Sequence, residues 1–407
     1  MVIAFLWCVH VPPVPIAQQA WFPEVPMTVW PVAVTMSGQI RRACYTILLV
    51  AALVALAGCE RNEPLRIGYL GTLTGRQSDL GIAGRDGVIF AVEEINRQGG
   101  INGRQVTLVT MDDRGDPAAA KVAVRELVGR KVAAIVGPMT SAIALATVPE
   151  VGGAPVVMVS PTVSSNELTG KDDNFVRVYP PSSSTARHLA IHARKNLGLD
   201  RVAVIYDVAN QAHTEGWYRR FRDHFESLGG VVGPVETFDS TQPVSFLSLS
   251  RVIASARPDG VFILAGGLDT AMFCQQFQKL SSRFTILASE WSSTDELILH
   301  GGSAVNGILF YQNFDRNDRS ARFSAFREAY RQRYSTDPDF GAVYAYDAAQ
   351  VVFRGLAAGN PAGLRGAIVS AGRFAGVQGE FTIDRSGDAE RTPFLMTVRN
   401  GEFRRVE

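Results

Sequence analysis

Short apolar runs alternate with amphipathic stretches along the chain from Leu65 onward. Runs such as LRIGYLGTLTG and QVTLVTMDD have the length and apolar content of buried strands, whereas GIAGRDGVIFAVEEIN places its apolar residues at helical spacing until Gly99-Gly100 stops it. This alternation predicts an α/β fold of parallel sheets with helices on both faces. The predicted strands are residues 65–75, 105–113, 132–138, 154–162, 201–207, 229–238, 259–267, 284–290 and 307–310, and the predicted helices are residues 81–96, 118–130, 141–151, 214–227, 243–256, 271–280, 321–334 and 343–356.

The strand–helix rhythm occurs twice and predicts two Rossmann-like lobes. Between the halves lies VRVYPPSSSTARHL (176–189), whose prolines and serines are typical of a crossing segment. The chain ends in GEFTIDRSGD and PFLMTVRNGEFRRVE, an antiparallel region with a turn at Asn400-Gly401. We therefore expect two doubly wound lobes with a ligand cleft between them, at the carboxyl ends of the strands.

The stretch ILLVAALVALAGC, which ends at Cys59 and follows Arg41 and Arg42, has the pattern of a bacterial lipoprotein signal. Its apolar run is short for a membrane span and closes with small residues, as a cleavable signal does. Residues 56–59 (LAGC) match a lipobox, in which the Cys59 thiol receives the lipid. The alternatives are a membrane-spanning anchor or a secretory signal that happens to contain a cysteine. On the lipoprotein interpretation, everything after Cys59 works outside the cytoplasm, and residues 1–58 do not belong to the fold.

The first 35 residues fit a signal poorly, because they contain several prolines and no Lys or Arg. Met36 is followed closely by Arg41 and Arg42, the basic start that a signal peptide needs. We therefore predict that translation begins at Met36 and that residues 1–35 are a mis-assigned leader; the alternative is a genuine leader.

Composition narrows the function classes. About 350 residues follow the signal, which exceeds one comfortable core and favours two domains. Forty Lys and Arg balance 39 Asp and Glu without long blocks of either sign, which argues against nucleic acid as a partner. After Cys59 only Cys274 remains, so no disulfide is expected. MDDRGDP (111–117) lacks the spacing of a calcium loop and is interpreted as a helix cap; no metal, cofactor or catalytic motif is found.

The motifs EEINRQGGINGR (93–104) and GPMTS (137–141), with VSPT and NELT after them, resemble the type I periplasmic binding proteins. Within that family they are most similar to the leucine/isoleucine/valine-binding group of ABC amino-acid uptake systems. The resemblance implies two lobes joined by three crossing segments that close on a small ligand. It implies an N-terminal lobe of residues 64–182 and 314–378 and a C-terminal lobe of residues 183–313 and 379–407.

Two hydroxyl-rich loops are candidate ligand contacts in the N-terminal lobe. Thr140 and Ser141 stand where a helix begins, and free amides there favour a carboxylate; the alternative is that they only cap the helix. Thr162 and Ser164 follow the next strand, where the resemblance implies hydrogen bonds to an amino acid's backbone groups. A simple turn is the alternative for this loop.

Glu290, directly after the strand FTILAS, is the candidate partner for a ligand ammonium group. A carboxylate in a closing cleft needs a cation, and the resembled family carries a glutamate near this position. Weaker candidates are His213 at the start of a helix, Asp269 after Gly266-Gly267, and Tyr346.

Two positions depart from the resembled group. Its cleft aromatics fall near Leu80 and Leu268 here. The groups that hold an amino acid's α-carboxylate and α-amine are therefore expected to be retained, whereas branched-chain specificity is not implied.

These observations predict a monomeric, non-enzymatic substrate-binding protein of an ABC uptake system. It would be anchored through Cys59 on the extracytoplasmic side and would deliver an amino acid or similar zwitterion to a membrane permease. The alternative is a ligand-sensing or regulatory lipoprotein that acts on a membrane or cell-wall protein.

The Met36 start can be tested by intact-mass measurement of the unprocessed precursor. We expect the mass of a chain that begins at Met36, because the basic residues needed for export lie just after it. A precursor that begins at Met1 would contradict this prediction.

Overall fold

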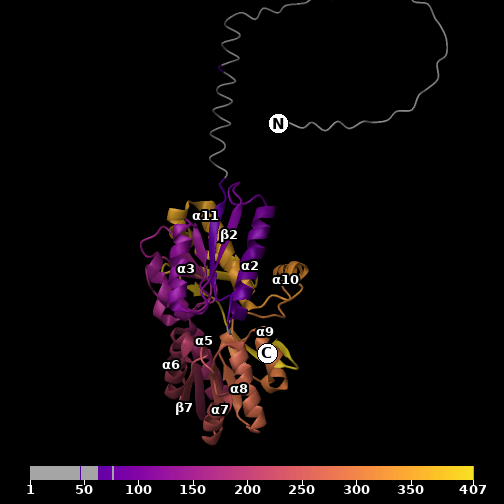
Figure 1. Cartoon of the computed structure of the whole chain (residues 1–407). Coiled ribbons are helices and arrows are strands. Elements are labelled where there is room, and N and C mark those ends of the chain that lie inside the picture. Colours follow the sequence, from indigo (N-terminus) through magenta and orange to yellow (C-terminus); the bar gives the residue numbers. More distant parts are fainter. Residues whose placement is uncertain (1–45, 47–62, 76–77, 407) are drawn as a thin grey trace, which may run out of the picture. The chain divides into compact units, whose positions relative to one another are not determined.

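The computed structural model describes Thr46, residues 63–75 and residues 78–406. The predicted lipoprotein signal, Cys59 and the Met36 start lie outside the described residues. The described part is an α/β protein with two mainly parallel sheets, each covered by helices on both faces, so the predicted fold class is confirmed (Figure 1).

The first sheet is fully parallel, with the strand order β2-β1-β3-β4-β5. Alternate residues of each strand face opposite sides: Ile67 and Tyr69 of β1 pack with helices α2 and α11, whereas Leu70 packs with α3 and α4. Its elements are β1 (Leu65–Gly71), α2 (Ser78–Arg97), β2 (Val106–Asp112), α3 (Pro117–Gly129), β3 (Ala134–Val136), α4 (Ser141–Thr147), β4 (Val157–Ser160), β5 (Phe175–Arg177), α10 (Ala321–Tyr334), α11 (Phe340–Ala358) and α12 (Leu364–Ala371).

The second sheet has the order β15-β14-β10-β9-β8-β6-β7. Strands β6 to β10 are parallel, whereas β14 and β15 are antiparallel and joined by the predicted turn, in which Asn400 and Gly401 have φ angles of 52° and 74°. Its elements are α5 (Ser182–Ile191), β6 (Arg201–Asp207), α6 (Gln211–Ser227), β7 (Val231–Phe238), α7 (Phe246–Ser255), β8 (Gly260–Leu264), α8 (Gly267–Lys279), β9 (Thr285–Ala288), α9 (Asp295–Gly301), β10 (Leu309–Gln312), β14 (Phe394–Arg399) and β15 (Glu402–Arg405).

The chain passes between the two sheets three times, as expected from the resemblance. It leaves the first sheet after β5, returns after β10 to form α10 and α11, and crosses again after β13 to enter β14. Each lobe is therefore discontinuous in sequence.

One part of the predicted lobe boundary differs from the structure. Residues 379–390 were expected in the C-terminal lobe, but they form β12 (Gly379–Ile383) and β13 (Ala389–Glu390) of a small antiparallel sheet with β11 (Arg373–Gly376). The apolar side chains Phe381, Ile383 and Ala389 pack into the core of the N-terminal lobe. Burial of these side chains assigns the segment to that lobe, and we propose the remaining boundaries as predicted.

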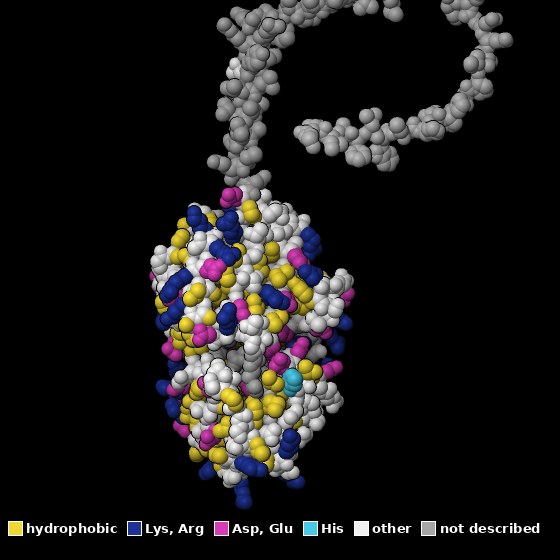
Figure 2. All heavy atoms as spheres, in the orientation of Figure 1, with side chains coloured by type: hydrophobic (Ala, Val, Ile, Leu, Met, Phe, Trp, Pro, Cys, Tyr) yellow, Lys and Arg dark blue, Asp and Glu magenta, His cyan; other side chains and the backbone are white. Residues whose placement is uncertain are grey.

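The predicted helix cap after β2 is confirmed. Asp116 accepts a hydrogen bond from the Ala119 amide at 2.7 Å and caps α3. Cys274 is a buried free cysteine of α8. Within the described residues, no helix is long and apolar enough to span a membrane. Basic and acidic side chains are interspersed on the face shown in Figure 2, in keeping with the balanced charge.

A buried ion pair ties the end of β5 to the small sheet. Arg177 is fully buried, and its guanidinium lies 2.6 Å from Oδ1 of Asp388 while it also donates to the Ser165 carbonyl at 2.8 Å. Burial lowers the pKa of Arg177, and the Asp388 charge opposes that shift. The pair joins residues 211 positions apart, just before the first and third crossings.

Asp388→Asn should lower the free energy of unfolding by about 3–5 kcal/mol, because it leaves the buried Arg177 charge without its counter-ion. Urea denaturation measures this change. Glu380→Gln, in the exposed pair with Arg373, is the matched control and should leave stability nearly unchanged. Equal effects of the two substitutions would contradict the prediction.

Candidate ligand-binding site

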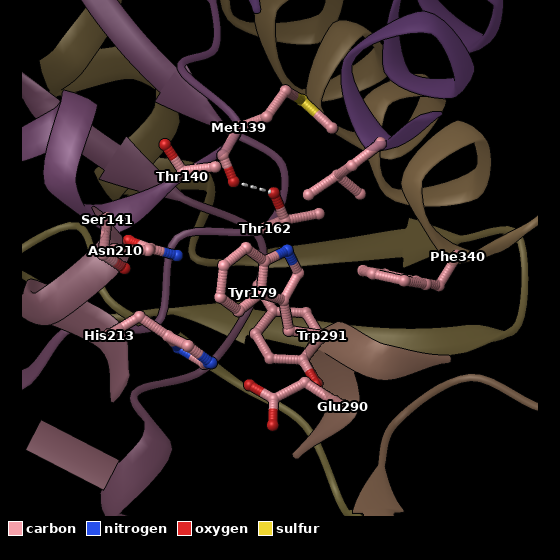
Figure 3. A pocket seen from close by; sticks show the side chains of 11 residues that line it. Met139, Thr140, Ser141, Thr162, Tyr179, Asn210, His213, Glu290, Trp291 and Phe340 are labelled. Atoms are coloured by element: carbon pink, nitrogen blue, oxygen red, sulfur yellow. Dashed lines mark hydrogen bonds between the residues drawn. The ribbon is translucent and has the colours of Figure 1, made fainter. Parts of the chain in front are cut away.

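Side chains from both lobes converge on one small cavity at the carboxyl ends of the strands (Figure 3). The space they leave is about 20 Å³, roughly enough for one water molecule. The cavity is lined by Leu80, Met139, Thr140, Ser141, Thr162, Tyr179, Asn210, His213, Glu290, Trp291 and Phe340.

The loop between β3 and α4 brings two hydroxyls to the cavity. Gly137 turns the chain there with a φ of 125°, and a Cβ at this position would lie 2.2 Å from the Leu70 carbonyl oxygen. Thr140 precedes α4, but its side chain makes no capping hydrogen bond, and Ser141 Oγ accepts from the Ser165 amide at 3.2 Å. The hydroxyl of Thr140 is thus not used as a helix cap.

The loop after β4 places Thr162 and Ser164 beside these residues. The Thr162 hydroxyl donates to the Met139 carbonyl, so its oxygen can still accept hydrogen bonds from the cavity (Figure 3). Ser164 is fully buried; its Oγ lies 2.9 Å from Nδ1 of His213 and donates to Glu290 Oε1 at 3.4 Å. Ser164 therefore links the two polar groups of the C-terminal lobe to the N-terminal lobe.

Glu290 begins a short turn after β9 and is only 4% exposed. Its Oε2 accepts from Trp217 Nε1 at 3.0 Å, and its Oε1 accepts from Ser164. Burial raises the pKa of Glu290 to about 7. Among the described residues it forms no ion pair, so its negative charge, when present, is balanced by hydrogen bonds from its own backbone amide, from Trp217 and from Ser164.

His213, in the first turn of α6, lies on the same cavity wall. Burial lowers the pKa of His213 to about 4, so the ring is neutral at pH 7. Its ring is nearly perpendicular to that of Trp291 at a ring-centroid distance of 5.7 Å, and its Nε2 has no hydrogen-bond partner among the described residues. Because the Ser164 hydroxyl donates to Glu290, Nδ1 of His213 is the donor to Ser164, and Nε2 can offer one acceptor to a ligand without adding charge.

Asn210 makes a direct hydrogen bond between the lobes. Its side-chain oxygen accepts from the amide of Ala142 at the start of α4, at 3.0 Å. The amide that would favour a ligand carboxylate thus already faces a neutral oxygen from the opposite lobe. A carboxylate here would share or replace that acceptor.

Most of the residues singled out from the sequence meet at this site, but two do not. Thr140, Ser141, Thr162, His213 and Glu290 line the cavity, and Ser164 lies behind it. Asp269 is buried in the first turn of α8 and does not line the cavity. Tyr346 lies in α11 on a different cavity, where its hydroxyl donates to Glu94.

Other lining residues were not found from the sequence. Tyr179 follows β5 in the first crossing, Asn210 lies in the loop after β6, and Phe340 begins α11. Of these, only Asn210 follows a predicted strand closely enough to be expected at the ligand site from the sequence. Trp217, which holds Glu290, lies one turn beyond His213 on α6 and is fully buried.

Known proteins with a similar sequence and fold match most of this chain. A leucine-binding protein of Thermotoga maritima is 28% identical, with a TM-score of 0.78 over 84% of this chain and 98% of that one. The Leu/Ile/Val-binding protein BraC3 of Rhizobium johnstonii is 29% identical over 65% of this chain and 71% of its own. The Leu/Ile/Val-binding protein homolog 2 of Brucella abortus is 26% identical over 89% and 98%.

The family model described as "Periplasmic binding protein" matches residues 64–402. Its members bind solutes outside the cytoplasm and are not enzymes, which confirms the predicted class and its extracytoplasmic location. The resemblance to the leucine/isoleucine/valine-binding group is confirmed by the relatives above. The chain belongs to the periplasmic binding protein family.

Proposed function

We propose that this protein is the substrate-binding component of an ABC uptake system and that it closes its two lobes on an amino acid or a related small zwitterion. One observation carries the proposal: Glu290 is a buried carboxylate that has no cationic partner among the described residues and faces a cavity shared by both lobes. Isolated buried charges are costly, so a site of this kind is completed by a cation from the ligand.

The cavity offers acceptors for an ammonium group and donors for a carboxylate, as a zwitterion requires. Glu290 and the oxygen of Thr162 can accept from an ammonium group. The hydroxyls of Thr140 and Ser141 can donate to a carboxylate. Because these groups come from different lobes, a bound zwitterion would bridge the lobes and favour the closed form.

The apolar part of the wall would receive the ligand's side chain. It consists of Leu80 and Met139, with the rings of Trp291 and Phe340. Such a wall favours an apolar side chain and offers no partner for a second charge. The named relatives that bind leucine, isoleucine or valine make these amino acids the first ligands to test.

The cavity of about 20 Å³ requires the lobes to open before a ligand of this size enters. Ligand contact with both lobes then shifts the equilibrium toward the closed form. In the proposed system a membrane permease binds that closed form, the protein acts as a monomer, and the lipid on Cys59 keeps it at the membrane. The lipobox pattern supports the anchor.

Leucine, isoleucine or valine at about 100 times its Kd should stabilise the purified protein by roughly 2.7 kcal/mol, seen as a rise in Tm. Glu290→Gln should weaken binding about 10- to 100-fold, because it removes the charged partner of the ammonium group. Calorimetric titration gives both affinities.

Glu226→Gln, an exposed position of α6 outside the cavity, is the matched control and should bind as the wild type does. If no zwitterion binds, or if Glu290→Gln binds as tightly as the control, the proposed role of Glu290 is wrong.

The unliganded protein should also lose stability as Glu290 ionises. Folding raises the pKa of Glu290 from 4.5 to about 7, so its contribution to stability is present below pH 4.5 and is lost as the pH rises through 7. Glu290→Gln removes this dependence. The free energy of unfolding of the variant minus that of the wild type should therefore rise by up to about 3 kcal/mol between pH 4.5 and pH 8.

Urea denaturation of both proteins at pH 5 and pH 8 measures this difference. Other groups that titrate in this range, such as Asp339, whose pKa burial raises to about 6, are present in both proteins and cancel. A difference that does not change with pH would show that Glu290 is not held in an environment that disfavours its charge.

A further inference from the structure

A second cavity lies in the N-terminal lobe, among α2, α10, α11 and the small antiparallel sheet. Its volume of about 600 Å³ is in the range of small-molecule sites, and it shares no lining residue with the cavity between the lobes. In Figure 1, α10 stands beside α2, and Phe326 of α10 contacts Phe90 of α2 at a ring-centroid distance of 5.6 Å. We propose that this second cavity, the α10 cavity, binds a small organic anion with an aromatic or apolar body.

The walls of the α10 cavity are aromatic. Phe90 and Phe326 form one side, and Phe374 and Phe381 of the small sheet form another, with their rings stacked at 5.7 Å. The four rings are part of the main core of the lobe, so their positions are fixed by packing. A ligand with a flat or branched apolar body would contact preformed surfaces and would not have to order them.

Small residues keep the cavity open. Ala325 and Ala329 lie one turn apart on the face of α10 that lines the cavity, and both are exposed. At these positions a larger apolar side chain would fill the space. The sequence of α10 thus places the core residue Phe326 next to two small residues that leave room beside it.

The charged groups on the cavity wall leave a surplus of positive charge. Three arginines line it: Arg97, Arg322 and Arg354. Arg322 donates to the Gly376 carbonyl at 2.9 Å and Arg354 to the Arg373 carbonyl at 2.8 Å. None of the three forms an ion pair within residues 63–75 and 78–406, whereas the nearby Arg391 does.

The two carboxylates on the wall are already engaged by the protein. Glu94 accepts from the hydroxyl of Tyr346, and Asp347 lies 2.7 Å from the guanidinium of Arg391 and accepts from the Val377 amide at 2.8 Å. Asp347 is paired with Arg391, whereas the Tyr346 hydroxyl brings no charge to Glu94, so three guanidinium groups on the wall stand against one carboxylate without an ion pair among the described residues. This surplus favours a negatively charged ligand. Guanidinium groups are well suited to carboxylate, sulfonate or phosphate oxygens.

The test uses 1-anilinonaphthalene-8-sulfonate, an aromatic anion whose fluorescence rises in apolar surroundings, titrated into the purified protein. We expect saturable binding at one site. Arg97→Gln combined with Arg322→Gln should weaken this binding about tenfold, since it removes two charged partners of the anion. Ala329→Trp, which keeps all charges but fills the cavity, should weaken it at least as much.

Arg251→Gln, at an exposed arginine of α7 outside both cavities, is the control for loss of a surface positive charge and should leave the affinity unchanged. Urea midpoints of all variants establish that they are folded. Glu290→Gln should also leave the probe's affinity unchanged, so the result does not depend on whether the proposed amino-acid function holds.

Three outcomes would overturn the proposal. They are the absence of saturable binding to the wild type, equal affinities for the α10-cavity variants and Arg251→Gln, and displacement of the probe by leucine together with its loss in Glu290→Gln. The last result would place the probe in the cavity between the lobes.

Discussion

The parallel arrangement of the strands is the constraint on which this structure depends. In a parallel sheet every strand ends at the same edge, so the loops after β3, β4, β6 and β9 gather at one end of their lobe. The two sheets meet across these edges, and residues from all four loops, or from the helix that follows, line one cavity. Segments far apart in sequence thereby form one site without any of them leaving its own lobe.

The electrostatics of that cavity follow from two ionisable side chains that the lobes bury, Glu290 and His213. Glu290 is held by Trp217 and Ser164 but is matched by no cation of the described residues, and His213 beside it is kept neutral by burial. A carboxylate in this state is a poor contributor to the stability of the unliganded protein. In the proposed function the same group would provide differential binding once a cationic group enters, and this difference in free energy would favour lobe closure.

Sequence analysis identified the cavity-lining residues that directly follow strands. It missed those that lie on a crossing segment or at the start of a helix in the other part of a lobe. Thr140, Thr162 and Glu290 each stand at the end of an apolar run, where this fold class allows ligand contacts, and the family resemblance favoured that role over a helix cap or a turn. Tyr179 and Phe340 reach the cavity from a crossing segment and from the start of α11, after the chain has changed lobes. Tyr346 stands six residues beyond Phe340 on α11 yet lines the α10 cavity instead, because a helix turns its successive side chains to different neighbours.

The sequence by itself determined the alternation of strands and helices, the turn at Asn400-Gly401 and the cap at Asp116, because each depends on residues close in the chain. Tertiary structure alone decided that residues 379–390 pack with the N-terminal lobe, that Trp217 donates to Glu290, and that Asn210 bonds across the lobes. The two hydrogen bonds join residues 73 and 68 positions apart, and their partners are selected by packing between elements, which no local pattern encodes.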